Sequence, residues 1–340
     1  MSSQLQIFLS QFTQYEQKRG MPKSHLEKLP SLLRRIIEEE MPCRDNMVHV
    51  SIRDLTNSQG LKLRINSEQS WCFPKDECLM SGTIYPYWRR GLRQICKDEY
   101  LYDSISGFFH FASQYVSRSR TVDLIGAIAL EYNRACDFRG KYMQELTIEK
   151  EVSIDTFKNK YCPEVNRRKK RRGKERRLLY YFNTFNALDP FIHRLIFNYV
   201  RAIDLFNKCF EEEAIIALEN TINISEQFVR ERLKISDEDQ RAITAYILGF
   251  TRSEYWILKR IYELRCYFGA HPSMSKWWDF FEIYENSFDE MFQTVKKLVI
   301  RTAEFEQANR IVEKEPRIWS AWLNSNLLML WNAVWFHRLP

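Results

Sequence analysis

The long segment without glycine or proline between residues 191 and 248 is the feature that most constrains how this chain can fold. The whole sequence of 340 residues contains only 10 Gly and 10 Pro. Both residues interrupt helices, so their scarcity favours a chain built from helices with few turns. One helix of that length would need coiled-coil heptads, which the segment lacks. We therefore expect several consecutive helices that pack into a bundle.

Helix-capping signals divide this part of the sequence. Asp189 at the N-cap and Pro190 at the first helical position begin a helix with one apolar face. That face consists of Ile192, Leu195, Ile196, Tyr199, Ile203 and Phe206. Further helices are expected to begin near Glu211, at Thr251 and after Pro316. Two more are expected at capping pairs: one at Ser236 with Asp239, and one near Phe288, where Ser287 and Glu290 form the pair. These signals predict a bundle of five or six helices.

The N-terminal part combines helical and strand periodicity. Helical spacing appears in residues 5–15, 30–37, 87–96, 101–116 and 122–136, the last opened by Thr121. Alternating apolar residues over 48–52 and again over 61–65 predict one β-hairpin with its turn at 57–60. Residues 71–80 show no clear pattern and suit a loop or a short strand, and residues 145–148 suit a strand.

These patterns predict a mainly α protein in three parts. Residues 1–140 form a smaller α+β region of unknown role that contains the β-hairpin. Residues 141–186 form a basic connector, and residues 187–340 form the helical bundle with its C-terminal helices.

Positive charge is concentrated in one run, residues 167–177. The run holds nine basic residues and one acid, a net +8, so the rest of the chain carries −1 of the total +7. Such a run suits the binding of RNA phosphates, and Tyr180, Tyr181 and Phe182 beyond it offer stacking faces. A solvated linker or a localisation tract is the alternative interpretation. The candidate RNA-binding residues are Arg167, Arg168, Lys169, Lys170, Arg171, Arg172, Lys174, Arg176 and Arg177.

The cysteines bear on the compartment. All 8 are scattered, without a C-x-x-C pair and without a secretory signal ahead of them. Disulfides persist mainly in oxidising compartments, so this usage predicts reduced thiols and a cytoplasmic location. The apolar run 327–336 is about half as long as a bilayer span requires, and Asn332 interrupts it. We expect no membrane partner, no metal and no other cofactor.

Residues 251–272 form a helix whose two ends are both marked in the sequence. Thr251 and Glu254 make a capping box, and Gly269 with Pro272 supplies a helix stop. The apolar stripe between these signals consists of Ile257, Ile261, Leu264 and Phe268, with Leu258 at its flank.

Arg265 returns to that flank in the last turn, and His271 follows just past the stop. The sequence RCYFGAH over residues 265–271 resembles the signature of HEPN domains (higher eukaryotes and prokaryotes nucleotide-binding), in which Arg, four to six residues and His end a core helix of a short bundle. The resemblance covers only the part from Asp189 onward. It implies a metal-independent endoribonuclease, of the kind found in toxin and defence proteins, with Arg265 and His271 as catalytic residues.

RNA cleavage without a metal needs a base for the 2′-hydroxyl, an acid for the leaving 5′-oxygen and positive charge for the phosphorane. Arg265 can supply bidentate charge to phosphate oxygens. His271 is the candidate for proton transfer, because imidazole titrates near neutral pH and a helix C-terminus favours its protonated form. One Arg and one His are too few for all three tasks. The resemblance therefore implies a homodimer with two such pairs in one cleft, and RNA and a neutralising protein are the other expected partners.

The same spacing occurs at Arg19 with His25 and at Arg44 with His49. A glycine and a proline interrupt the first pair, and the second leads into a predicted strand, so neither ends a capped helix. Cys266 departs from the family pattern, which places Asn, Asp or His after the arginine, since a thiol is a poor donor and acceptor.

The residues also allow three other interpretations. In the first, the bundle is a catalytically inactive module that binds RNA or a protein partner. In the second, Arg265 packs along the bundle edge and His271 only caps its helix. In the third, the N-terminal half carries the activity. Trp277 and Trp278 serve either as walls of a base pocket or as core residues.

Overall fold

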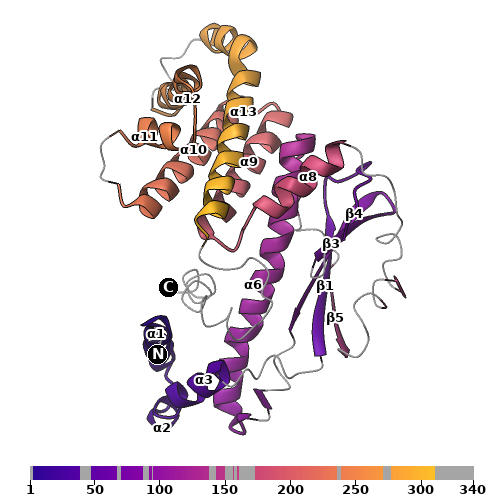
Figure 1. Ribbon diagram of the computed structural model, residues 1–340, viewed down its shortest axis with the longest axis vertical. Helices are drawn as coiled ribbons and strands as arrows, with labels where there is room; N and C mark the ends of the chain where they lie inside the picture. The colour runs from indigo at the N-terminus through magenta and orange to yellow at the C-terminus, as the bar shows by residue number, and fades with distance from the viewer. Residues whose placement is uncertain are drawn as a thin grey trace.

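The computed structural model describes residues 3–38, 47–66, 70–86, 92–93, 95–137, 143–149, 156, 159–160, 173–235, 239–270 and 277–310. Within them the chain is mainly helical with one antiparallel sheet, as expected (Figure 1). The helices are α1 (Ser3–Lys18), α2 (Lys23–Leu26), α3 (Leu29–Glu38), α6 (Glu99–Tyr132), α8 (Gly173–Thr184), α9 (Pro190–Asn207), α10 (Glu211–Leu233), α11 (Gln240–Ile247), α12 (Arg252–Ala270) and α13 (Trp277–Ala308). The strands are β1 (Met47–Leu55), β2 (Ile65–Asn66), β3 (Ser70–Lys75), β4 (Cys78–Pro86) and β5 (Met143–Glu149).

The sheet has the strand order β2-β3-β4-β1-β5, and the predicted hairpin is wrong. β1 pairs with β4 and β5 rather than with residues 61–65. Leu63 and Ile65 are buried in the core, so their alternation reports burial and not pairing with β1. The hairpin lies instead between β3 and β4, with a turn at Asp76, whose φ is +53°.

The β3–β4 hairpin falls in the segment without a clear sequence pattern. Trp71, Cys72 and Phe73 are consecutive buried residues of β3. A strand covered on both faces shows no alternation of polar and apolar residues. The sequence therefore lacks the period-two pattern from which a strand is usually predicted.

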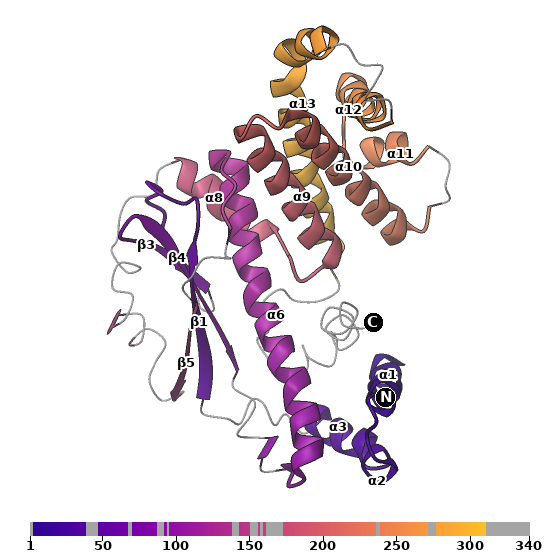
Figure 2. The ribbon, with the colours of Figure 1, turned by 180° about the vertical axis from the view of Figure 1, so that it is seen from behind.

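Helix α6 is the longest described helix and contacts the N-terminal helices, the sheet and the bundle. Figures 1 and 2 show it running from α1–α3 at one end to the bundle at the other, with the sheet beside it. The sequence predicted two helices with a start at Thr121, but Thr121 is buried inside one continuous helix. Asp98 caps its start by accepting a hydrogen bond of 3.1 Å from the Leu101 backbone N–H, and Asn133 ends it in a left-handed conformation.

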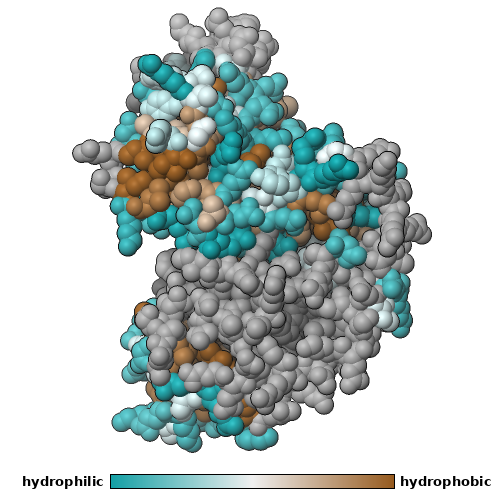
Figure 3. Space-filling model, in the orientation of Figure 1, coloured by the Kyte–Doolittle hydropathy of each residue, from teal (hydrophilic) through white to brown (hydrophobic). Residues whose placement is uncertain are grey.

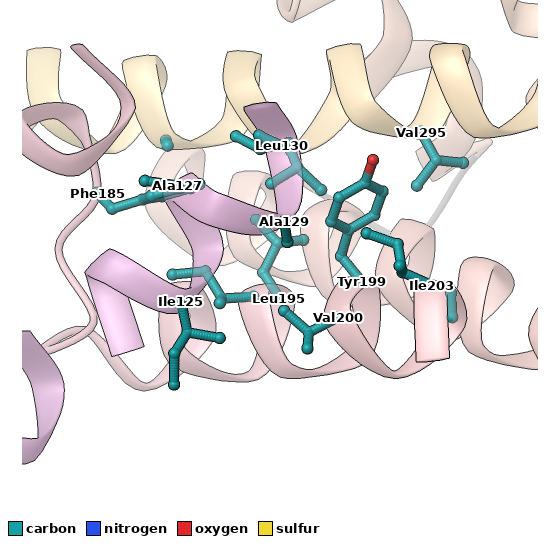
Figure 4. Packing of buried hydrophobic residues seen from close by; sticks show 14 of the residues in the cluster. Ile125, Ala127, Ala129, Leu130, Phe185, Leu195, Tyr199, Val200, Ile203 and Val295 are labelled. Carbon is teal, nitrogen blue, oxygen red and sulfur yellow. The ribbon is translucent and has the colours of Figure 1, made fainter. Parts of the chain in front are cut away.

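Two hydrophobic cores lie along α6. The smaller one joins its first half to α1 and α3, where the Phe108 ring lies 5.2 Å from that of Phe8 and 5.7 Å from that of Phe12. The larger core joins its second half to the sheet and to the bundle. Figure 4 shows Ile125 and Ala129 beside Leu195 and Tyr199 of α9.

The predicted boundaries at 140 and 187 do not divide this larger core. β5, inside the expected connector, pairs with β1 and completes the sheet. α8, in the same segment, buries Leu178 and Phe182 in the core shared with α6 and α9. The segment 141–186 therefore contains two elements of the fold.

Most helix starts of the bundle match the capping signals. Asp189 Oδ1 accepts hydrogen bonds from the backbone N–H of Phe191 at 2.8 Å and of Ile192 at 3.3 Å, and α10 begins at Glu211 as expected. The cap of α11 is Asp239, while Ser236 lies outside the described residues.

The predicted start of α13 is wrong, and the predicted C-terminal helix is not tested. α13 begins at Trp277 rather than near Phe288, and Ser287 is buried inside it, because no helix breaker separates the two positions. The helix expected after Pro316 lies outside the described residues. No helix in the described ranges has both the length and the apolar character needed to cross a bilayer.

Candidate functional site on helix α12

The predicted capping box fixes the start of α12. The Thr251 N–H donates to Glu254 Oε2 at 2.8 Å, and the Glu254 N–H donates to Thr251 Oγ1 at 3.3 Å. Lys297 Nζ of α13 also bonds Glu254 Oε1 at 2.7 Å and so ties the two helices together. The described part of the helix reaches Ala270, and Pro272 of the predicted stop lies outside the described residues.

Arg265 lies on α12 with an exposed side chain. Ile261 and Leu264 of the expected stripe are buried, and Leu258, expected at its flank, is buried as well. Ile257 is only partly buried, and the side chain of Phe268 lies outside the described residues. Arg265 makes no hydrogen bond or ion pair with any residue in the described part of the chain. Its guanidinium therefore offers its N–H groups and its charge to a ligand. His271 lies outside the described residues, so the pairing with Arg265 stays a prediction.

A buried ionic cluster lies under α12, and the sequence did not reveal it. Arg241 of α11 donates to Glu219 Oε1 at 2.7 Å and to Glu226 Oε1 at 2.6 Å, both on α10. It also donates to the carbonyl of Leu258 on α12 at 3.1 Å. Burial raises the pKa of both glutamates, more than their bonds to Arg241 lower it. The two glutamates lie seven residues apart on the apolar face of α10, and this spacing was the signal in the sequence that could have predicted a buried ionic cluster.

Cys266 and Tyr262 lie one helical turn apart beside this cluster. A hydrogen bond between the thiol and the phenol raises the pKa of Tyr262. The Tyr262 ring also faces Arg241, whose guanidinium carbon is 5.3 Å from the ring centroid. The residue that departs from the family pattern is thus engaged with its own helix.

The described part of the basic run is mostly used in packing. Arg177 makes a bidentate contact with Glu131 of α6, at 2.9 and 2.6 Å, and Lys174 lies over the Tyr132 ring. Tyr180 donates a hydrogen bond to Glu304. Arg176 is exposed, and residues 167–172 lie outside the described ranges. We conclude that Arg177 and Lys174 attach α8 to α6.

Of the other two Arg–His spacings, only Arg19 with His25 lies in the described part of the chain, and its two side chains are engaged separately. Arg19 pairs with Glu16 at 3.3 Å, whereas His25 Nε2 lies 3.0 Å from Asp98 at the start of α6. Arg44 and the side chain of His49 lie outside the described residues, as do the side chains of Trp277 and Trp278.

Two further findings concern metal ligands and known relatives. Among the described residues, no group of three or more His, Cys, Asp or Glu side chains is placed to hold a metal ion. Comparison with known proteins gives no relative, since no family model, no curated protein and no solved structure matches this chain.

Proposed function

We propose that this protein is a metal-independent endoribonuclease of the HEPN type, in which Arg265 and His271 carry the reaction. The observation that supports the proposal most strongly is the exposed guanidinium of Arg265 near the end of α12, which has no hydrogen bond or ion pair with a described residue. Two other arginines of the bundle, Arg241 and Arg310, are instead held by carboxylates. An arginine left without such a partner is available for an anionic substrate.

In this reaction Arg265 binds the phosphate oxygens and stabilises the added charge of the phosphorane. His271 transfers the proton of the 2′-hydroxyl or protonates the leaving 5′-oxygen. The products are a 2′,3′-cyclic phosphate end and a 5′-hydroxyl end.

A homodimer would supply a second Arg–His pair. The bundle exposes apolar side chains that a dimer could bury, including Leu233 of α10 and Tyr246 of α11. Figure 3 shows a hydrophobic patch on the face over these two helices. Contiguous patches of this kind often mark interaction sites. The mass of the purified protein in solution tests this part of the proposal.

The reaction is tested with purified full-length protein and single-stranded RNA in the presence of EDTA. We expect cleavage with cyclic phosphate ends, and a loss of about 100-fold or more in both Arg265→Ala and His271→Ala. Arg260→Ala is the matched control, because Arg260 is an exposed arginine of the same helix, and it should cleave as the wild type does.

Persisting cleavage in both variants contradicts the assignment of these residues. RNA binding without any cleavage by the wild type would instead support the inactive binding module.

A further inference from the structure

Glu219 has a carboxylate oxygen that nothing in the described part of the chain satisfies. The residue is 1% exposed and lies on α10, facing α11 and α12. Its Oε1 accepts the hydrogen bond from Arg241, but its Oε2 is buried without a hydrogen-bond partner among the described residues. A buried carboxylate oxygen left in this way is costly, so its position points to a missing donor.

The charges of the cluster lead to the same conclusion. Glu219 and Glu226 are two buried carboxylates, and within the described ranges Arg241 is the one guanidinium that bonds to both. The group of three thus carries a net charge of −1 when both carboxylates are ionised. Buried charges are normally paired, so a second cation is expected next to Glu219 or Glu226.

Arg265 is placed to be that cation for Glu219. It follows Leu258 by seven residues, which returns it to the side of α12 that bonds Arg241 through the Leu258 carbonyl. The positive charge of Arg265 acts on Glu219, whose pKa it lowers against the larger effect of burial. The charges that affect the pKa of Glu226 are instead those of Arg241, which lowers it, and Asp239, which raises it.

We propose that Glu219 is the positioning residue of the Arg265 site. In the RNA complex its free oxygen Oε2 accepts N–H groups from one edge of the Arg265 guanidinium, and the other edge binds the phosphate. A guanidinium has five donors in a planar fork, so it can serve both anions at once. This inference rests on the proposed function for its role in catalysis, but the Glu219–Arg265 interaction itself does not.

Glu219→Gln is the main test, and Glu226→Gln is its matched control. Both variants remove one carboxylate from the same cluster and keep Arg241 paired with the other, so both should fold. We expect Glu219→Gln to lower kcat by about tenfold or more with little change in KM, because a misplaced catalytic group costs rate. Glu226→Gln should stay within about threefold of wild type, since its partner does not touch substrate. If Glu219→Gln does not fold, Glu219→Asp keeps the charge and moves the oxygen, and the same loss is expected.

A thermal-unfolding cycle tests the pair without catalysis. The charge of Arg265 already attracts Glu219 in the free protein. Arg265→Ala should therefore lower Tm slightly in the wild type and in Glu226→Gln, but not in Glu219→Gln, where that attraction is already lost. Equal Tm shifts in all three backgrounds, or a Glu219→Gln enzyme as fast as the wild type, would overturn the inference. A protein that cleaves no RNA but shows the expected Tm cycle would contradict the proposed function and leave the pair intact.

Discussion

Arg241 connects three helices of the bundle through a single side chain. It extends from α11, bonds two carboxylates of α10 and reaches a carbonyl of α12. Removing one partner of a buried ionic group leaves uncompensated charge, which is far more destabilising than the loss of an exposed pair. The Arg241→Met variant should therefore lose about 3–5 kcal/mol of unfolding free energy near pH 8.

The same variant should recover part of that stability near pH 5. Burial raises the pKa of Glu219 and of Glu226 in the folded state, so folding favours their protonated forms. Their contribution to stability is greatest below the ordinary glutamate pKa of 4.5 and falls as the pH rises through their raised values. Urea unfolding at both pH values measures the difference. Arg301→Met, which breaks an exposed pair with Glu304, is the control and should cost less than about 1 kcal/mol. An equal loss at both pH values would contradict the expectation.

At the scale of elements, the sequence located the helices more reliably than it located their pairing or length. Caps at Asp189 and Thr251 act through local hydrogen bonds, and both were predictable. Sheet pairing depends on contacts between distant residues, so alternation at Leu63 and Ile65 did not identify a partner strand. The continuity of α6 through Thr121 depends on burial against α9 and the sheet, which local signals do not contain.

Two glycines in α6 show how packing overrides helix propensity. A Cβ atom at Gly126 would lie 2.9 Å from Ile196 Cγ2 and 3.1 Å from the Phe185 ring, whereas no described atom lies within 4 Å of a Cβ at Gly107. Replacing a helical glycine with alanine gains about 1 kcal/mol of propensity. Gly107→Ala should therefore raise the unfolding free energy by up to about 1 kcal/mol.

Gly126→Ala should lower the unfolding free energy despite the same gain, because overpacking a filled core costs about 1–3 kcal/mol. Ile196 is branched next to the backbone and cannot easily move aside. Chemical unfolding of the two variants beside the wild type provides the comparison. If both glycine variants are stabilised, α6 and α9 are not as closely packed as the structure indicates.

At the scale of the whole molecule, α6 makes the bundle and the sheet parts of one core. The sequence predicted a boundary because the basic run resembles a linker. Composition alone cannot show that β5 before the run and α8, which begins within it, are both packed. The candidate site was predictable only in part for a similar reason. Arg265 could be found from its helix, whereas the Glu219–Arg241 pair under α12 forms only after three helices have packed.

A fragment of residues 187–340 should therefore fail to fold as a unit. Without α6 and α8, the apolar face of α9, including Leu195 and Tyr199, loses the residues that cover it. We expect the fragment to bind a hydrophobic dye and to lose its circular dichroism gradually on heating, while the full chain unfolds in a cooperative transition. The full chain, which keeps α6, α8 and the sheet, is the control. A fragment that melts as sharply as the full chain and cleaves RNA would show that the bundle is an independent domain after all.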